Sequence, residues 1–192
     1  MNTPADPQLE YLRVPPHSIE AEQSVLGGLL LDNTAWDRIA DVLVEEDFYR
    51  HDHRLIWHHI ARLIGLARPA DVITVNESLI SAGKAEDSGG LAYLNALAHN
   101  TPSAANIRRY AEIVRERAML RKLVSIADEI SSAALNPQGK EARQLLDEAE
   151  SKVFKIAQEG SRGAAGFQEI QPLLTQVVER IDERYHLSLI HI

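Results

Sequence analysis

The stretch PPHSIEAEQSVLGGLLLDN, residues 15–33, has the features of a buried helix with a defined start. Two prolines keep the chain before it extended, because the proline ring does not fit inside a helix. Ser18 is a candidate N-cap, and acidic side chains follow it in the first turn, where the helix dipole stabilises negative charge. Gly27 and Gly28 each cost a helix about 1 kcal/mol relative to alanine. We therefore expect another backbone or element to approach closely at these glycines.

The composition of the chain is that of an ordinary globular protein, with 192 residues, 45% hydrophobic and 25% charged. The absence of cysteine excludes disulfides, thiolate metal sites and a cysteine nucleophile. The first residues lack the basic and apolar regions of a signal peptide, and no apolar run is long enough to span a membrane. We expect a cytoplasmic protein with no membrane contact.

The net charge of −8 comes from residues 1–100, which carry 15 acidic and 7 basic residues. A chain of this kind is a poor candidate for binding nucleic-acid phosphates by itself. The one basic cluster lies between residues 108 and 122 and is interrupted by glutamates. It is either a solvated helix face with local ion pairs or a surface for docking a partner. The candidate partner-facing residues are Arg108, Arg115, Arg121 and Lys122.

The apolar spacing predicts an all-α fold that begins with a disordered arm, residues 1–14, and a compact helical head, residues 15–100. Trp36, Ile39, Ala40 and Leu43 have the spacing of a second helix with one buried stripe. Later helices are expected before Pro69, from Asp71 to Gly83, and through residues 91–97.

A long helical hairpin is predicted for residues 101–158. No proline or glycine interrupts residues 104–134, so a helix about 45 Å long can form there. A turn at residues 136–139 and a second amphipathic helix complete an antiparallel pair. Two isolated helices bury only their mutual seam, so the remaining apolar positions predict self-association. The residues expected at the seam or at an oligomer interface, which the sequence does not separate, are Ile107, Val114, Leu123, Ile130, Leu145, Leu146 and Val153.

A glycine-rich flexible linker, residues 159–169, precedes a linker helix, residues 170–185. A helix of this length is marginally stable alone in water. We therefore expect it to dock on another domain or subunit, through Leu173, Leu174, Val177, Val178 and Ile181.

Three strings resemble the N-terminal domain of bacterial replicative DNA helicases of the DnaB type: residues 15–33, GGLAYLNALAHNTPSAANIRRYAEIVRERA (89–118) and LLDEAESKVFKIAQ (145–158). The resemblance extends from Leu12 to about Tyr185. It implies a helical collar that assembles a hexameric ring and receives primase, with the linker helix packed on the neighbouring subunit's motor. A helicase loader is a further candidate partner.

In the family an ATP-driven, RecA-like motor domain follows these elements, and this chain lacks it. A phosphate-binding loop needs G-x-x-x-x-G-K-[ST], whereas Gly83-Lys84 and Gly139-Lys140 lack the first glycine and the hydroxyl residue. We therefore expect no catalytic or cofactor-binding residue and no activity of this chain alone. ATP, Mg²⁺ and DNA binding are implied only for the missing motor. The apolar tail, residues 186–192, departs from the family and is interpreted as an artefact of a truncated or mis-joined reading frame.

The sequence also allows other interpretations. His51, His53, His58 and His59, with Asp52, contain metal-ligand groups. Their spacing instead favours exposed histidines at a helix start, so no metal site is expected. The chain could also be a truncated record of a full ATP-dependent DNA helicase, or a motorless helical adaptor that binds the helicase ring.

Overall fold

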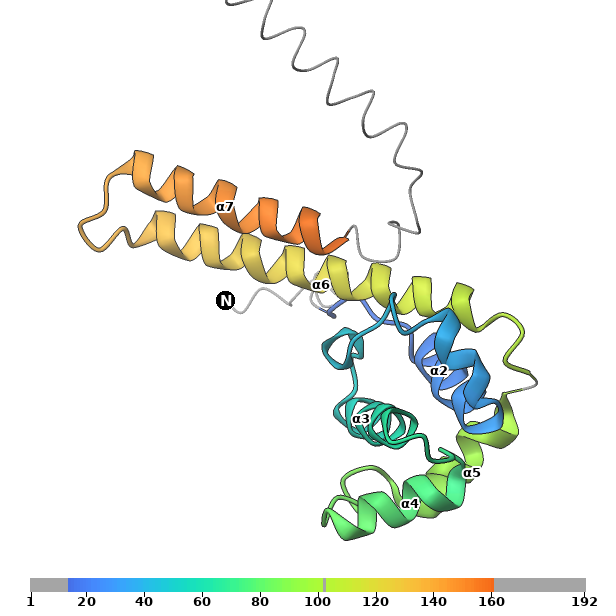
Figure 1. The fold of residues 1–192 in the computed structure, drawn as a ribbon. Coiled ribbons are helices and arrows are strands. Elements are labelled where there is room, and N and C mark those ends of the chain that lie inside the picture. Colours follow the sequence, from blue (N-terminus) through green and yellow to red (C-terminus); the bar gives the residue numbers. More distant parts are fainter. Residues whose placement is uncertain (1–13, 102, 161–192) are drawn as a thin grey trace, which may run out of the picture. The chain divides into compact units, whose positions relative to one another are not determined.

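The computed structural model describes residues 14–101 and 103–160. All regular elements in these ranges are helical, which confirms the predicted all-α class. In chain order they are α2 (Ile19–Leu31), η1 (Asn33–Arg38), η2 (Glu45–Asp47), α3 (His51–Gly65), α4 (Val72–Ser81), α5 (Gly90–Asn100), α6 (Ile107–Leu135) and α7 (Ala142–Gly160) (Figure 1). The predicted linker helix, its docking residues and the apolar tail lie outside the described residues.

Helix α2 forms the centre of the head and contacts α3, α5 and α6. Ser18 is its N-cap, as predicted: the hydroxyl accepts a hydrogen bond from the Ala21 amide. A Cβ built on Gly27 would lie 2.3 Å from the carbonyl oxygen of Leu97 in α5. The close approach predicted from the glycine pair is therefore confirmed, and the approaching element is the last turn of α5.

The predicted second α-helix is wrong, because residues 33–38 form a 3₁₀ helix that ends at Ile39. The Asp32 carboxylate accepts hydrogen bonds from the amide and the hydroxyl of Thr34, which bends the chain directly after α2. Ile39 and Leu43 are nevertheless buried, whereas Ala40 is exposed. The sequence thus placed the apolar anchors correctly but not the backbone that carries them.

The next three helices follow the predicted pattern. Asp71 caps α4 by accepting hydrogen bonds from the amides of Ile73 and Thr74, each at 2.9 Å. Gly83 follows α4 with a φ of +66°, a left-handed conformation that glycine adopts without strain. Val75 and Leu79 of α4 are buried in the core.

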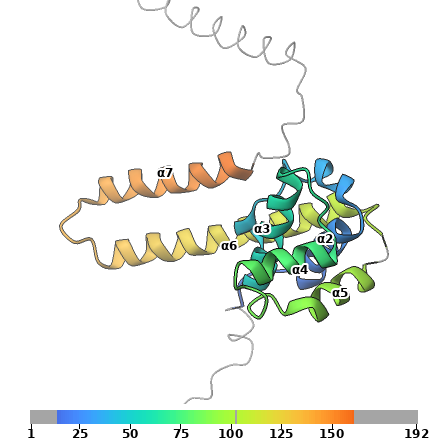
Figure 2. The ribbon, with the colours of Figure 1, turned by 60° about the horizontal axis from the view of Figure 1, so that its bottom comes forward.

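The first three turns of α6 belong to the head as much as to the hairpin. Ile107, Ala111 and Val114 are buried in the head core, and Ala118 is buried as well. Beyond these residues α6 continues, and α7 runs back along its second half (Figure 2). The predicted boundary at residue 100 therefore does not separate two independent cores.

Candidate interaction surface on the helical hairpin

The hairpin consists of the second half of α6, a short turn and α7. The turn contains Pro137, which cannot continue a helix, and it reverses through positive φ at Gln138 and Gly139. Helix α6 has 29 residues and α7 has 19. The long antiparallel pair predicted from the sequence is present in the structure.

The seam between the two helices is only half-buried. It contains Ile126, Ile130 and Ala133 from α6 and Leu145 and Ala149 from α7, all of intermediate exposure. Near the turn the helices enclose an open hollow of about 390 Å³ whose lining includes Ile130, Ala133 and Leu145. The two hairpin helices therefore lack the fully buried apolar core that would make them stable in isolation.

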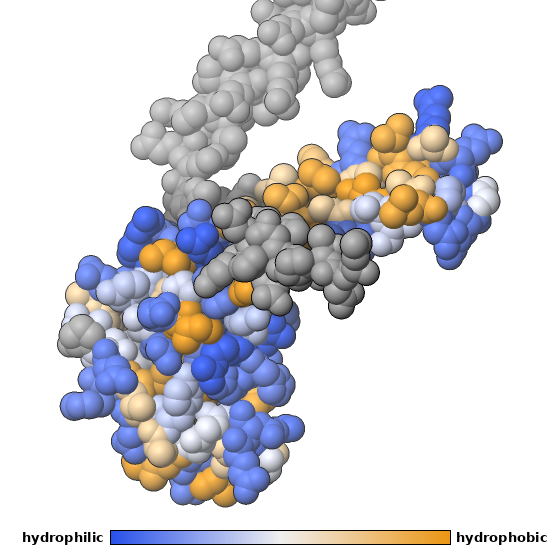
Figure 3. All heavy atoms as spheres, turned by 180° about the vertical axis from the view of Figure 1, so that it is seen from behind, coloured by the Kyte–Doolittle hydropathy of each residue, from blue (hydrophilic) through white to orange (hydrophobic). Residues whose placement is uncertain are grey.

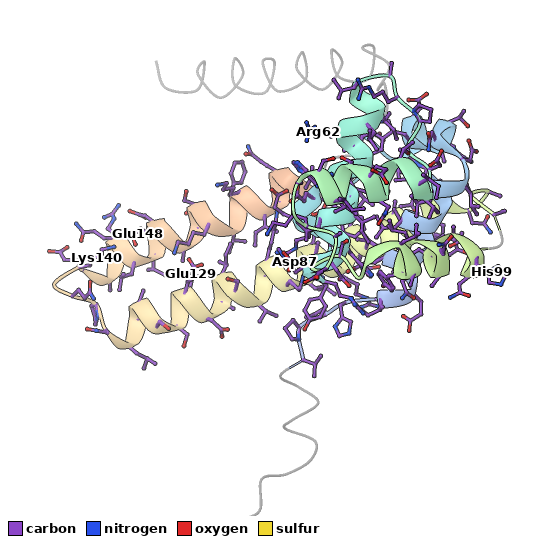
Figure 4. The ribbon with its side chains drawn as sticks, turned by 90° about the horizontal axis from the view of Figure 1, so that it is seen from below. Arg62, Asp87, His99, Glu129, Lys140 and Glu148 are labelled. Atoms are coloured by element: carbon purple, nitrogen blue, oxygen red, sulfur yellow. The ribbon has the colours of Figure 1, made fainter. Side chains whose placement is uncertain are left out.

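Two ion pairs lie beside this hollow, one between the turn and α7 and one between α7 and α6. Lys140 Nζ lies 2.7 Å from Glu148 Oε1, and Lys152 Nζ lies 2.7 Å from Glu129 Oε2 (Figure 4). All four side chains are well exposed to solvent, so each pair contributes at most about 1 kcal/mol. The hairpin therefore does not owe its stability to these pairs.

A second set of apolar side chains on the hairpin is largely exposed to solvent (Figure 3), although one of them, Leu146, also lines the hollow near the turn. We call this set the hairpin apolar face: Leu120, Leu123, Val124, Leu146 and Val153. Their exposed fractions run from 37% for Leu120 to 70% for Leu146. Large apolar side chains gathered in this way on a surface are typical of a protein–protein interface.

The periodicity of the helices places these residues on one side of the hairpin. At about 100° per residue, Leu123, Leu120 and Val124 lie about 50°, 110° and 150° around α6 from the mean direction of its seam residues. Leu146 and Val153 lie about 70° around α7 from its seam, in the same rotational sense. Because the helices are antiparallel, equal rotations turn both stripes toward the same face. The five residues therefore lie on the same side of the two helices.

The seven residues predicted for the seam or interface are divided by the structure into three groups. Ile107 and Val114 are buried in the head core, so their assignment to the hairpin is corrected. Ile130 and Leu145 lie at the seam. The remaining three, Leu123, Leu146 and Val153, belong to the hairpin apolar face.

The basic cluster is also divided. Arg115 is 5% exposed, and its Nη1 donates to Asp47 Oδ1 at 2.7 Å. Arg121 is half-buried and donates to the carbonyl oxygens of Pro16 and Asp47. These two residues were predicted to face a partner, but they hold α6 against the head. Arg108 is exposed, and Lys122 lines a small hollow between α6 and α7.

The histidine cluster is only partly the exposed group that the sequence suggested: His51 and His58 are exposed, whereas His53 and His59 are buried. His53 is fully buried, with Nδ1 2.6 Å from Glu22 Oε2 and Nε2 2.7 Å from the Tyr93 hydroxyl oxygen. His59 is also buried and contacts the Ser78 hydroxyl at 2.7 Å. Glu22 and Tyr93 lie 31 and 40 residues from His53, so no local pattern could reveal this network.

Within the described residues, no group of three or more histidine, aspartate or glutamate side chains is arranged to hold a metal ion. The same ranges contain no helix long and apolar enough to cross a membrane.

Comparison with known proteins identifies the family. Residues 14–116 match the model of the DnaB-like helicase N-terminal domain, which spans the head and the first turns of α6. The chain belongs to this family. The N-terminal resemblance read from the sequence is thus confirmed.

Replicative DNA helicases of the DnaB type are similar to this chain in sequence. The DnaB helicase of Haemophilus influenzae is 42% identical over 178 residues, which cover 93% of this chain and 38% of that protein. The one from Geobacillus stearothermophilus is 39% identical over 170 residues, covering 88% of this chain and 37% of that protein. The chain thus spans about two fifths of the length of these relatives.

Solved structures agree with the fold. The crystal structure of the N-terminal domain of DnaB helicase from Mycobacterium tuberculosis superposes with a TM-score of 0.71 at 36% identity, covering 74% of this chain and 99% of that one. A structure of a DnaB-like replicative helicase and its interactions with primase gives a TM-score of 0.63 at 24% identity, covering 86% of this chain and 36% of that one. The second likeness shows the shared fold alone.

Proposed function

We propose that this chain is the collar of a replicative DNA helicase that acts in bacterial DNA replication in the cytoplasm. In this proposal the collar assembles the helicase ring, a hexamer, and docks primase. ATP hydrolysis and DNA unwinding are assigned to a motor domain outside this chain. The proposal rests on family membership together with one structural observation, the exposed apolar face of the hairpin.

The hairpin apolar face favours assembly, because apolar side chains exposed to water gain free energy of stabilisation when a partner buries them. Complete burial of one leucine- or valine-sized side chain contributes about 1.5–3 kcal/mol, and all five residues of the face are more than a third exposed. Burying them against a partner would also close the half-open seam beneath them. A two-helix face that packs against its own copy forms a four-helix arrangement, a common solution for such stripes.

Docking of primase is proposed from a solved helicase of the same fold. A DnaB-like helicase of the same fold has been solved with its interactions with primase, which shows that a protein of this architecture contacts that partner. The linker-docking residues Leu173, Leu174, Val177, Val178 and Ile181 and the helicase loader stay predictions from the sequence.

The assembly proposal is tested by measuring the mass of the purified chain in solution by light scattering. We expect the wild-type chain to form oligomers, and Leu146→Glu and Leu123→Glu to shift the mass toward the monomer without loss of helical circular dichroism. Ser125→Glu is the matched control, because Ser125 is exposed and lines the hollow on the opposite, polar side of the hairpin.

The possible results separate folding from assembly. A wild-type chain that stays monomeric at high concentration would refute assembly through this surface. An equal mass for Leu146→Glu, Leu123→Glu and the wild type would refute the role of the hairpin apolar face. Binding of purified cognate primase to the wild-type chain, measured by calorimetry, tests the second part of the proposal independently.

A further inference from the structure

A second hollow lies on the head, between α3 and α4. It has a volume of about 530 Å³, within the size range of binding pockets in proteins. Its wall comes from the last turn of α3, the connector before α4, and one face of α4. We call it the α3–α4 groove. None of the hairpin apolar face residues lines it, so the two surfaces are distinct.

The groove exposes large apolar side chains that the core does not use. Leu66 is 57% exposed and Ile73 is 61% exposed, and both line the groove. The base is formed in part by Leu63, which is 8% exposed and belongs to the head core. A partner seated here could therefore bury apolar surface that continues directly from the core.

The charges of the groove are unusual for this head. Among the basic residues of the described part of the head, Arg38, Arg50 and Lys84 form ion pairs, and Arg54 donates to the Phe48 carbonyl. The guanidinium groups of the other two, Arg62 and Arg68, make no side-chain hydrogen bond or ion pair within the described residues, and both arginines line the groove. Two exposed guanidinium groups thus flank an apolar groove on a head rich in carboxylates.

We propose that the α3–α4 groove binds an amphipathic helix of a partner protein, with leucine-like anchors in the groove and carboxylates on Arg62 and Arg68. The apolar rim and elongated wall suit the docking of a helix by its apolar stripe. Arginine pairs with carboxylates through parallel hydrogen bonds, which makes acidic residues the matching groups. Glu77, on the α4 side of the groove, would disfavour a carboxylate at that edge and so orients the partner.

This interaction does not depend on ring assembly. Arg62 lies on the head, whereas Glu129, Lys140 and Glu148 lie on the hairpin (Figure 4). The hairpin cations Lys140 and Lys152 are already matched by glutamates, so an acidic helix could bind them only by displacing these partners.

The test uses two synthetic helical peptides of about 18 residues, long enough to cover the groove at about 1.5 Å per residue. The acidic peptide has a leucine stripe flanked by glutamates, and the control peptide has lysine at every glutamate position. Binding of each labelled peptide to the full chain is followed by fluorescence anisotropy. We expect the acidic peptide to bind the wild-type chain and the lysine peptide to bind much more weakly.

The deciding variant is the double substitution Arg62→Glu with Arg68→Glu. It should lower the affinity of the chain for the acidic peptide by on the order of tenfold and raise its affinity for the lysine peptide. The control, Arg143→Glu with Lys155→Glu, changes the net charge equally at exposed sites of α7 and should leave both affinities unchanged. The double substitution Leu66→Asn with Ile73→Asn should lower the affinity for both peptides by a similar factor.

The proposal is overturned if the acidic peptide does not bind the wild-type chain, or if the groove variant and the hairpin control affect it equally. The mass of the Arg62→Glu, Arg68→Glu variant by light scattering should equal that of the wild type. Failure of the groove proposal is thereby distinguished from failure of ring assembly through the hairpin.

Discussion

Substitution of Gly27 by alanine is expected to destabilise the head, although alanine is the better helix former. The new Cβ would lie 2.3 Å from the Leu97 carbonyl oxygen and 2.2 Å from the Thr101 hydroxyl oxygen. Atoms at van der Waals contact are separated by about 3.5 Å, so the end of α5 would have to move by about 1 Å. The hydroxyl can rotate away, but the carbonyl belongs to the backbone and cannot.

The magnitude follows from what such a shift disrupts. Leu94 and Leu97 of α5 are buried, and a gap of this size forfeits about a quarter to a half of the contact energy of each. With about 1.5–3 kcal/mol for each leucine, this loss is about 1–3 kcal/mol. The hydrogen bond from Thr101 to the Leu97 carbonyl contributes about 1 kcal/mol more. Subtracting about 1 kcal/mol for the helix propensity of alanine leaves about 2 kcal/mol of destabilisation.

The neighbouring glycine provides a matched control. A Cβ on Gly28 would lie 3.2 Å from Ile107 Cδ1, the end of a flexible side chain. The free energy of unfolding of Gly28→Ala is therefore expected to lie within about 1 kcal/mol of that of the wild type. Urea unfolding of both variants, followed by circular dichroism, measures the difference. Equal free energies of unfolding for Gly27→Ala and the wild type would refute the close approach of α5 to α2.

Three further predictions concern buried or capping groups. Asp47→Ala removes the carboxylate that faces buried Arg115 and should cost about 3 kcal/mol in urea unfolding; a cost below about 1 kcal/mol would contradict the buried pair. Burial lowers the pKa of His59 from 6.5, with smaller effects of His58 and Arg62, so the unfolded chain binds the proton more readily. The free energy of unfolding should therefore fall as the pH drops below about 6.5, and unchanged pH dependence in His59→Gln would count against this. Asp71→Ala removes the α4 cap and should lower the free energy of unfolding by about 1 kcal/mol, measured by thermal denaturation. Asp71→Asn should retain most of the capping contribution, because asparagine is also a good N-cap.

Much of the head could be predicted because its signals are local. A capping side chain acts on amides two or three residues away, so Ser18 and Asp71 were recognisable from the sequence. Apolar spacing identified the buried residues of α4 and the length of the hairpin. The same spacing failed between Trp36 and Leu43, because a local Asp32–Thr34 interaction bends the backbone while the apolar residues stay buried.

The candidate site was only partly predictable for a related reason. Periodicity shows that Ile107, Leu123 and Ile130 are apolar positions of one helix, but it does not show which neighbour covers each turn. The head covers the first of these, α7 covers the third, and the second remains exposed. The same holds for Arg115, whose partner Asp47 is 68 residues away.

The sequence by itself therefore determined the helices, most of their ends and the family, since these depend on residues a few positions apart. Only the tertiary structure decided which apolar and charged groups are free to meet a partner. It buried His53, Asp47 and Arg115 in paired contacts and left the hairpin apolar face and the α3–α4 groove exposed. The physical reason is that exposure depends on packing between segments far apart in the chain.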